Sequence, residues 1–383
     1  MIHPYIFRKE SYSYIFRKES YSYKNWILLN KIPHLGSKKC RQLVEWFGSP
    51  QKVLSASAKS LSLVPGLGKE AITSLIQGAK NIDINEDLKR IDELNIGVIS
   101  FRDSLYPSPL KTIFDPPFLL YVKGKLKKEE SDTLAIVGTR RPTTYGKLMA
   151  RRLARDLARE GITIVSGMAR GIDTAAHQGA LEVGGRTIAV LGSGVDVIYP
   201  PENKKLAEEI IKKGAVISEY PLGTEPNAPH FPQRNRIISG LAKGVLVVEA
   251  PLRSGALITA DFALEQGREV FAIPGNITNP NAQGVNRLVK EGAKLVECVE
   301  DILEELDFSL LNKKEKKTFD EEIPSLFSEE RKVLELLEEE PLHIDSLVSK
   351  SGLPASKVGG LLMKLQLKGL ARELPGKLFV RDR

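Results

Sequence analysis

Glycine, serine and arginine residues follow directly after three short apolar segments of this sequence. The first turn holds Gly138, Thr139, Arg140 and Arg141, the second Ser166, Gly167 and Arg170, and the third Gly192 and Gly194. Glycines allow backbone N–H groups to approach an anion, and an arginine guanidinium makes forked contacts with phosphate oxygens. The pattern therefore predicts a phosphate-binding surface. Several arginines suit a repeated phosphate backbone better than a single cofactor.

A second basic cluster surrounds an aromatic residue between positions 230 and 236, which we interpret as a loop. It contains Phe231, Arg234, Asn235 and Arg236. Proteins that hold single-stranded nucleic acid combine a basic track with aromatic rings on which bases stack, at about 1–3 kcal/mol per base. The cluster is consistent with such a track. Without its neighbours, Phe231 would be more typical of ordinary core packing.

Other ligand chemistries find little support in the sequence. The first turn lacks the G-x-G-x-x-G pattern of a dinucleotide site. Cys40 and Cys298 lie far apart, and neither His230 nor His343 has the spacing of metal ligands. We therefore expect no cofactor and no metal.

Alternation of short apolar runs with amphipathic helices indicates how these turns are positioned. The apolar runs cover residues 134–137, 162–165, 187–191, 215–217, 245–248 and 270–273. Continuous β-rich runs separated by helices, such as residues 147–159 and 256–266, are typical of a parallel sheet buried on both faces. The fold class predicted is α/β, with a Rossmann-like, doubly wound, mainly parallel sheet. Ligands of such sheets bind outside the carboxyl ends of the strands, where the turns lie.

The 383 residues are enough for several domains. Residues 1–23 contain a tandem copy of nine residues and are expected to be disordered, and residues 24–83 resemble a helix-hairpin-helix (SAM-like) domain. We expect residues 84–310 to form the Rossmann-like domain with its connector. Residues 311–327 are expected to form a linker, and the predicted elements of residues 328–383 follow the order of a winged helix. The two loops of the helical domain, at 33–36 and 65–69, resemble the phosphate-binding turns of helix-hairpin-helix units, although the first has His34 where a glycine is usual. A small helical packing module is the alternative.

Charge and hydropathy limit where the protein can be located and which partners it can have. The net charge is +8, and residues 24–83 carry nine basic and three acidic side chains, which favours a polyanionic partner or a solvated lysine-rich surface. No apolar run approaches the ~20 residues of a membrane span. Two unpaired cysteines fit a reducing compartment. We expect a cytoplasmic protein without a membrane partner.

Several strings of the sequence resemble the DprA/Smf family. They are VGTRRPTTYG (137–146), SGMARGIDTAAH (166–177), AVLGSGVDVIYP (189–200), FPQRNRIISGLA (231–242), SGALITADFALEQGREVFAIPG (254–275) and NRLVKEGAKLV (286–296). The resemblance implies a protein that is not an enzyme. It implies binding of single-stranded DNA, protection of incoming DNA during natural transformation, and loading of a RecA-type recombinase on strands coated by single-strand binding protein.

The resemblance also implies roles for individual residues. Arg140 and Arg170 would contact the DNA backbone, and Phe231 would stack on a base. Ser166, Gly167, Gly192 and Gly194 would line the track, while Arg234 and Arg236 would hold phosphates or shape their loop. A homodimer is implied through residues 286–296, with Asn286, Val289 and Leu295 at the matching positions; packing within the chain is the alternative for Leu288.

An enzyme is the main alternative, because this fold is similar to that of Rossmann-like nucleotide phosphoribohydrolases. Their P-G-G-x-G-T-x-x-E signature has no counterpart in residues 251–261, which leaves Glu249 and Glu265 as the nearby carboxylates to test. Asp173 and His177 are four residues apart, but no serine or cysteine nucleophile motif accompanies them, so we expect a structural role. A transcription factor built on the winged helix would leave the large α/β domain unexplained.

Overall fold

The computed structural model describes residues 23–127, 132–306, 328–337, 342–367, 370–374 and 376–381. The chain forms two compact units, Met1–Asn312 and Lys313–Arg383. The predicted linker 311–327 and all but the last residue of the predicted segment 1–23 lie outside the described residues. The other domain limits stay predictions.

The larger unit begins with a helical module, which we define as residues 24–93. Its helices are α2 (Lys24–Lys31), α3 (Ser37–Phe47), α4 (Pro50–Leu54), α5 (Ala58–Leu61), α6 (Lys69–Asn81) and α7 (Asn85–Glu93). Helix α3 buries Cys40, Leu43 and Val44, one stripe of an amphipathic helix. It ends at Gly48, whose φ of +90° is a left-handed conformation that glycine adopts without strain.

The centre of the larger unit is a nine-stranded sheet with the order β1-β2-β6-β5-β4-β3-β7-β8-β9. The strands are β1 (Gly97–Ser100), β2 (Leu119–Gly124), β3 (Thr133–Val137), β4 (Thr163–Ser166), β5 (Thr187–Val190), β6 (Ala215–Ser218), β7 (Gly244–Val247), β8 (Glu269–Ala272) and β9 (Lys294–Leu295). All neighbouring pairs from β6 to β9 in this order are parallel. The β1–β2 and β2–β6 pairs are antiparallel. The predicted doubly wound, mainly parallel sheet is confirmed, with three strands beyond the six predicted.

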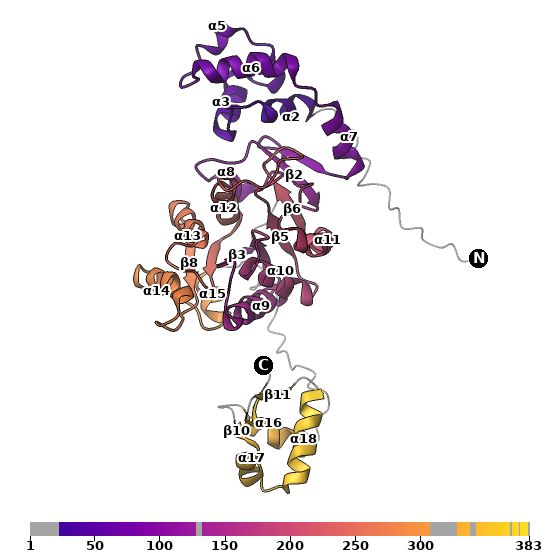
Figure 1. Ribbon diagram of the computed structural model, residues 1–383, viewed down its shortest axis with the longest axis vertical. Coiled ribbons are helices and arrows are strands. Elements are labelled where there is room, and N and C mark those ends of the chain that lie inside the picture. The colour runs from indigo at the N-terminus through magenta and orange to yellow at the C-terminus, as the bar shows by residue number, and fades with distance from the viewer. Residues whose placement is uncertain are drawn as a thin grey trace, which may run out of the picture. The chain divides into compact units, whose positions relative to one another are not determined.

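Helices cover both faces of this sheet (Figure 1). They are α8 (Ser108–Lys111), α9 (Thr144–Arg159), α10 (Ile172–Glu182), α11 (Lys204–Lys213), α12 (His230–Leu241), α13 (Gly255–Glu265), α14 (Gln283–Lys290) and α15 (Glu300–Glu305). Side chains of β3 alternate between the faces: Leu134 and Ile136 pack with α9 and α10, and Ala135 and Val137 pack with α12 and α13. The central strands are therefore buried on both sides.

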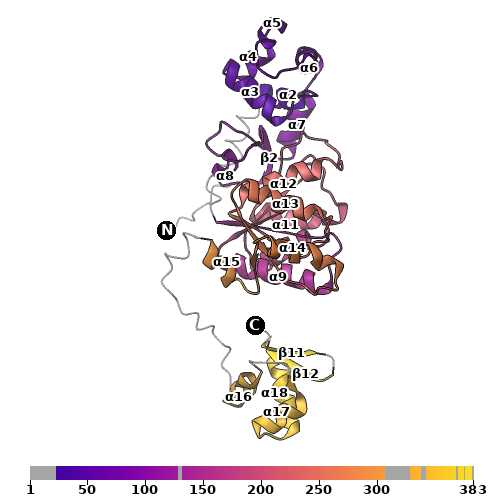
Figure 2. The ribbon, with the colours of Figure 1, turned by 90° about the vertical axis from the view of Figure 1, so that its left-hand side faces the viewer.

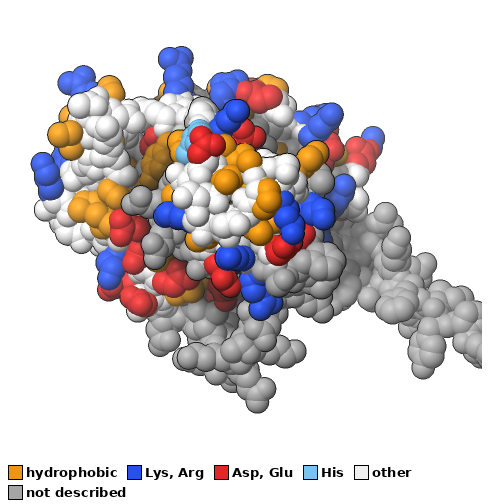
Figure 3. Space-filling view, turned by 90° about the horizontal axis from the view of Figure 1, so that it is seen from below, with side chains coloured by type: hydrophobic (Ala, Val, Ile, Leu, Met, Phe, Trp, Pro, Cys, Tyr) orange, Lys and Arg blue, Asp and Glu red, His pale blue; other side chains and the backbone are white. Residues whose placement is uncertain are grey.

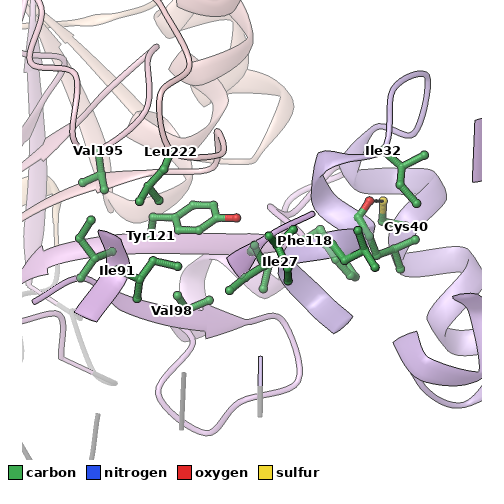
Figure 4. Packing of buried hydrophobic residues seen from close by; sticks show 14 of the residues in the cluster. Ile27, Ile32, Cys40, Ile91, Val98, Phe118, Tyr121, Val195 and Leu222 are labelled. Atoms are coloured by element: carbon green, nitrogen blue, oxygen red, sulfur yellow. Dashed lines mark hydrogen bonds between the residues drawn. The ribbon is translucent and has the colours of Figure 1, made fainter. Parts of the chain in front are cut away.

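The helical module packs against the β1–β2 end of the sheet, as two views show (Figure 1 and Figure 2). Ile27 belongs to the same buried cluster as Phe118, just before β2, Tyr121 of β2 and Val195 beyond β5, and Figure 4 shows members of this cluster. The Nδ2 atom of Asn30 donates to the Tyr121 hydroxyl at 3.5 Å. The module and the sheet thus share one hydrophobic core.

The smaller unit has the winged-helix order. It consists of α16 (Ser328–Leu336), β10 (Leu342–His343), α17 (Ile344–Ser351), α18 (Ala355–Leu367), β11 (Ala371–Leu374) and β12 (Leu378–Arg381), with the sheet order β10-β12-β11. Val333, Leu347, Val358 and Leu365 are buried at its centre. The predicted winged helix is confirmed.

On the one face that Figure 3 shows, the Lys and Arg side chains stand among acidic and apolar ones rather than in one band. Within the described ranges, no helix combines the length and apolar character needed to cross a membrane.

Candidate nucleic-acid interface

A cleft beside the sheet lies where the strand order reverses. Strands β3 and β7 are neighbours, but the chain visits β4, β5 and β6 between them, so the turns after β3 and β7 diverge and leave a crevice. The Thr139 N–H donates to the Glu249 carbonyl at 2.7 Å and joins the two turns at the floor. The cleft has a volume of about 830 Å³. We call it the switch-point cleft.

Positive charge dominates this cleft. Its charged lining residues are Arg140, Arg141, Arg234, Arg253 and the single carboxylate Asp173. Arg140, Arg141 and Arg253 are exposed, and none of the three forms an ion pair with a described residue. Guanidinium groups without a protein anion keep their donors available for phosphate. The cleft is therefore suited to a polyanion.

Phe231 lies in the cleft as a half-buried ring. The guanidinium carbon of Arg140 is 5.1 Å from the ring centroid, and the Tyr199 ring is 5.8 Å away. A Cβ added to Gly192 would come within 2.9 Å of the Phe231 ring, so this glycine makes room for it. A partly exposed ring beside a cation is the combination found in base-stacking platforms.

Residues 230–236 do not form the predicted loop but the first two turns of α12, whose start tolerates Pro232. Phe231, Arg234, Asn235 and Ile238 share the helix face that lines the cleft, as their i, i+3, i+4 and i+7 spacing requires. Helical phase, and not sequence proximity, decides which of these side chains reaches the cleft.

Arg234 is buried and acts chiefly on the protein itself. Its Nη1 donates to the carbonyls of Gly167, at 2.6 Å, and Val190, and its Nε donates to Asn235 Oδ1 at 3.2 Å. Burial lowers the pKa of this guanidinium to about 10, against the opposing charge of Asp173. Arg234 therefore fixes the ends of β4 and β5.

Asp173 lines the same region from the start of α10. Its Oδ2 accepts the Ala169 N–H at 3.2 Å, which braces the turn that carries Arg170. Burial raises the Asp173 pKa to about 6, while Arg234 works in the opposite direction. His177 is fully buried, with its Nδ1 2.7 Å from the Thr187 hydroxyl, and burial lowers its pKa to about 3. Both residues have the structural surroundings expected from the sequence.

Arg236 points away from the switch-point cleft. Its Nη1 and Nη2 donate to the two carboxylate oxygens of Glu219 at 2.6 and 2.7 Å, and its Nε donates to the Asp115 carbonyl at 2.9 Å. The residue is 8% exposed. The structure thus places this predicted DNA contact in an internal ion pair, in which its donors are already bound.

Arg170 is exposed at the rim, beside a small hollow that Tyr199 and Phe231 also line. Its Nη2 donates to Glu202 Oε2 at 3.0 Å, and its Nε also bonds that carboxylate. A phosphate at Arg170 must compete with Glu202. The two side chains are each about half exposed, so solvent weakens the pair.

The remaining turn residues are occupied within the protein. The Ser166 hydroxyl donates to the Ile136 carbonyl at 2.6 Å. A Cβ on Gly167 would come within 2.6 Å of Arg234, and the Gly194 N–H donates to the Thr224 carbonyl at 2.8 Å. These glycines and Ser166 therefore shape the cleft from beneath, and Gly138, Thr139, Arg140 and Arg141 line it directly.

The sequence patterns missed lining residues contributed by later segments. They include Tyr199, Arg253, Ser254 and Asn281. Arg253 and Ser254 follow β7, and the rule that sites lie at carboxyl ends of strands would have found them. Asn281 donates through Nδ2 to the Arg141 carbonyl at 3.0 Å, a contact across 140 positions that no local pattern reveals.

The predicted dimer residues have different surroundings. The Asn286 amide exchanges hydrogen bonds with the backbone of Gly275, at 2.9 and 3.1 Å. Val289 is partly buried, Leu288 is 6% exposed in the core, and Leu295 is 40% exposed. Leu288 packs within the chain, and Leu295 is the apolar side chain that this segment presents to solvent.

Neither carboxylate of the enzyme alternative faces the switch-point cleft. Glu249 accepts the N–H and the hydroxyl of Thr143 at 2.8 and 2.5 Å, and so holds the residue that caps the start of α9. Glu265 is the last residue of α13, at the opposite end from the cleft residue Gly255. Within the described part of the chain, no group of three or more His, Cys, Asp or Glu side chains is placed to hold a metal ion.

Family models match three parts of the chain. "DNA recombination-mediator protein A" matches residues 97–307, "DprA winged helix domain" matches 317–377, and "SAM-like Helix-hairpin-helix tandem" matches 27–81.

Individual relatives agree. The protein Smf of Synechocystis sp. is 34% identical over 93% of this chain and 98% of its own length. The crystal structure of DNA processing protein A from Streptococcus pneumoniae superposes with a TM-score of 0.66 at 38% identity, over 74% of this chain and 98% of that one. A DNA processing protein A from Helicobacter pylori, solved for its single-stranded DNA binding mode, superposes with a TM-score of 0.51 at 31% identity, over 58% and 98%. The matched motifs, the three-part architecture and these relatives together place the chain in the DprA/Smf family of DNA-processing proteins.

Proposed function

We propose that the switch-point cleft binds single-stranded DNA. The observation that carries the proposal is the combination, in one cleft, of three exposed arginines without ion-pair partners among the described residues and a half-buried Phe231 ring beside Arg140. Arginines hold successive phosphates, and the ring accepts a base that a duplex would keep stacked inside. The Helicobacter pylori relative, described by its single-stranded DNA binding mode, supports the same ligand.

Salt titration of oligonucleotide binding tests this function. Each phosphate contact contributes about 0.7 to the slope of log K against log salt for a single strand. We expect Arg140→Ala to weaken binding and to lower that slope by about 0.7. Arg159→Ala is the matched control, because Arg159 is an exposed arginine at the far end of α9. Equal slopes in wild type and Arg140→Ala would refute the assignment of Arg140.

A duplex of the same sequence provides the second comparison. Phe231→Ala should weaken single-strand binding by about 5- to 100-fold, the loss of one base–aromatic stack, and should leave the salt slope unchanged. The weaker affinity for the duplex should not change with this substitution, because paired bases are not free to stack on the ring. Tighter binding of the duplex than of the single strand would contradict the proposed function.

We further propose that the protein protects incoming DNA and loads a RecA-type recombinase on it during natural transformation, in the cytoplasm and without catalysis of its own. The match of residues 97–307 to the family described as a DNA recombination mediator supports this role. The two hydrogen bonds that Glu249 accepts from Thr143, the N-cap of α9, support the absence of nucleotide hydrolysis. The test is recombinase filament formation on strands coated by single-strand binding protein. Failure to accelerate it, or base release from nucleotides that Glu249→Gln abolishes, would oppose the proposal.

A homodimer through residues 286–296 completes the proposed function. Leu295 is 40% exposed and Val289 is partly buried, so both apolar side chains have surface that a partner copy can cover. Two linked clefts raise the local concentration of strand at the second site and increase avidity without new contacts. The proposed pairing is tested below through substitutions at both residues.

A further inference from the structure

A second, smaller cavity lies next to the switch-point cleft on the same edge of the sheet. Its lining includes Thr143, Tyr145 and Glu249, and also Asn276, Asn279 and Ala282 from the segment that follows β8. It adjoins the cleft along two segments at once: Arg141 lines the cleft and Thr143 the cavity, and Asn281 lines the cleft and Asn279 the cavity. The Asn281–Arg141 hydrogen bond of 3.0 Å stands between the two spaces.

The size of this cavity limits what it holds. Its volume is about 180 Å³, below the ~300–1,000 Å³ of pockets that enclose a whole small molecule. At ~30 Å³ for each water molecule, the space corresponds to about six waters. A single ring system fits such a volume, and a complete nucleotide with its sugar and phosphate does not.

The lining suits a flat ring with polar edges. Tyr145 is 51% exposed at the mouth and offers an aromatic face. Glu249 is 3% exposed, and each of its carboxylate oxygens accepts one hydrogen bond from Thr143, which leaves a further lone pair on each oxygen for a ring or amino N–H group. Asn279 uses its Oδ1 for the Asn281 N–H, which leaves its amide nitrogen outside that bond as a donor. An aromatic face, an acceptor and a donor are the groups that recognise a nucleobase.

We infer that this cavity receives one base of the DNA strand bound in the switch-point cleft, with Tyr145 as its stacking partner. The inference rests on the proposed function, because the strand must first occupy the cleft. The strand would pass the Arg141–Asn281 bridge, and the base would turn into the cavity while its sugar and phosphate stay outside. Phe231 and Tyr145 then stack bases at two separate positions of one strand.

The test combines protein variants with abasic oligonucleotides. Tyr145→Ala should weaken binding of an intact strand by about 5- to 100-fold without altering the salt slope, because stacking involves no counterion release. Tyr145→Phe keeps the ring and should bind as wild type does. Leu148→Ala is the matched control, since Leu148 is 50% exposed on the same helix and does not line the cavity.

A single abasic site moved along the oligonucleotide locates the base. At one position, wild type and Tyr145→Ala should bind with equal affinity, because the ring has then lost its partner. 2-Aminopurine placed there should be quenched by wild type and not by Tyr145→Ala, while the free 2-aminopurine deoxynucleoside should remain unquenched. Quenching of the free nucleoside but not of the strand would mean that the cavity takes free nucleosides, and the inference would be wrong.

Two failures remain distinguishable. If wild type binds no single-stranded DNA, the proposed function itself fails. If wild type binds with the Arg140-dependent salt slope, but Tyr145→Ala matches it at every abasic position, only the assignment of the cavity is overturned.

Discussion

Substitution of Arg236 tests whether this arginine stabilises the fold or contacts DNA. Its guanidinium forms a bidentate pair with Glu219, and both side chains are at most 10% exposed. Arg236→Ala leaves the Glu219 carboxylate buried with only the Ser37 hydroxyl, 3.1 Å away, as a described side-chain donor. Breaking a buried pair in this way costs about 3–5 kcal/mol.

That loss translates into a measurable shift of thermal unfolding. A change of 1 kcal/mol moves the Tm of a domain of this size by about 2–4 °C, so Arg236→Ala should lower the Tm of the larger unit by about 6–20 °C. Arg236→Met with Glu219→Leu should recover much of the loss, because neither charge is then left alone. Arg159→Ala, in an exposed pair with Asp156, should leave the Tm unchanged.

DNA binding provides the second readout. Below the transition, folded Arg236→Ala should keep the salt slope of wild type, because Arg236 is expected to contact no phosphate. Circular dichroism against temperature and a fluorescence-anisotropy salt titration measure the two quantities on the same samples. An unchanged Tm together with a slope lowered by about 0.7 would refute this reasoning and restore Arg236 as a phosphate contact.

Three other predictions concern the charge of the cleft and the pairing of the chain. The pKa of Asp173 is raised to about 6 from an ordinary ~3.9, so its contribution to folding stability is present below pH ~4 and is lost as the pH rises through about 6. Oligonucleotide affinity should rise as the pH falls through about 6, because the cleft loses a negative charge, and a titration of Asp173→Asn should lack this component. Glu202→Gln should tighten binding measured by anisotropy, because Arg170 no longer shares its donors with a carboxylate; weaker binding would remove Arg170 from the interface. Val289→Glu with Leu295→Arg should give a folded monomer by light scattering, with weaker and less cooperative DNA binding, and a double variant that stays dimeric would exclude this interface.

Much of the sheet and of the cleft was predictable because both depend on local patterns. Continuous apolar runs predict buried parallel strands, and the turns after β3, β4 and β5 must meet at one edge of the sheet. Strands β1 and β2 escaped prediction because prolines interrupt the connector around them and because the pairing of β2 with β6 is long-range. The antiparallel register of such a pair cannot be recognised from the residues of a short sequence segment.

The roles of the arginines were less predictable. Arg140, Arg234 and Arg236 are chemically identical in the sequence, and their burial separates them. Arg236 meets Glu219 and the Asp115 carbonyl, which lie 17 and 121 positions away. The phase of α12 turns Arg234 toward the ends of β4 and β5. Only tertiary contacts distinguish a phosphate contact from an internal ion pair.

The core shared by the helical module and the sheet bears on how this protein can change in evolution or in the laboratory. Ile27 and its neighbours cover Phe118 and Tyr121, so a chain cut near residue 83 would leave a large apolar surface uncovered. A segment that is to be exchanged between related proteins must therefore include the strands β1 and β2 together with the helices that cover them. The module and the sheet should also melt in one cooperative transition, since neither has a complete core without the other.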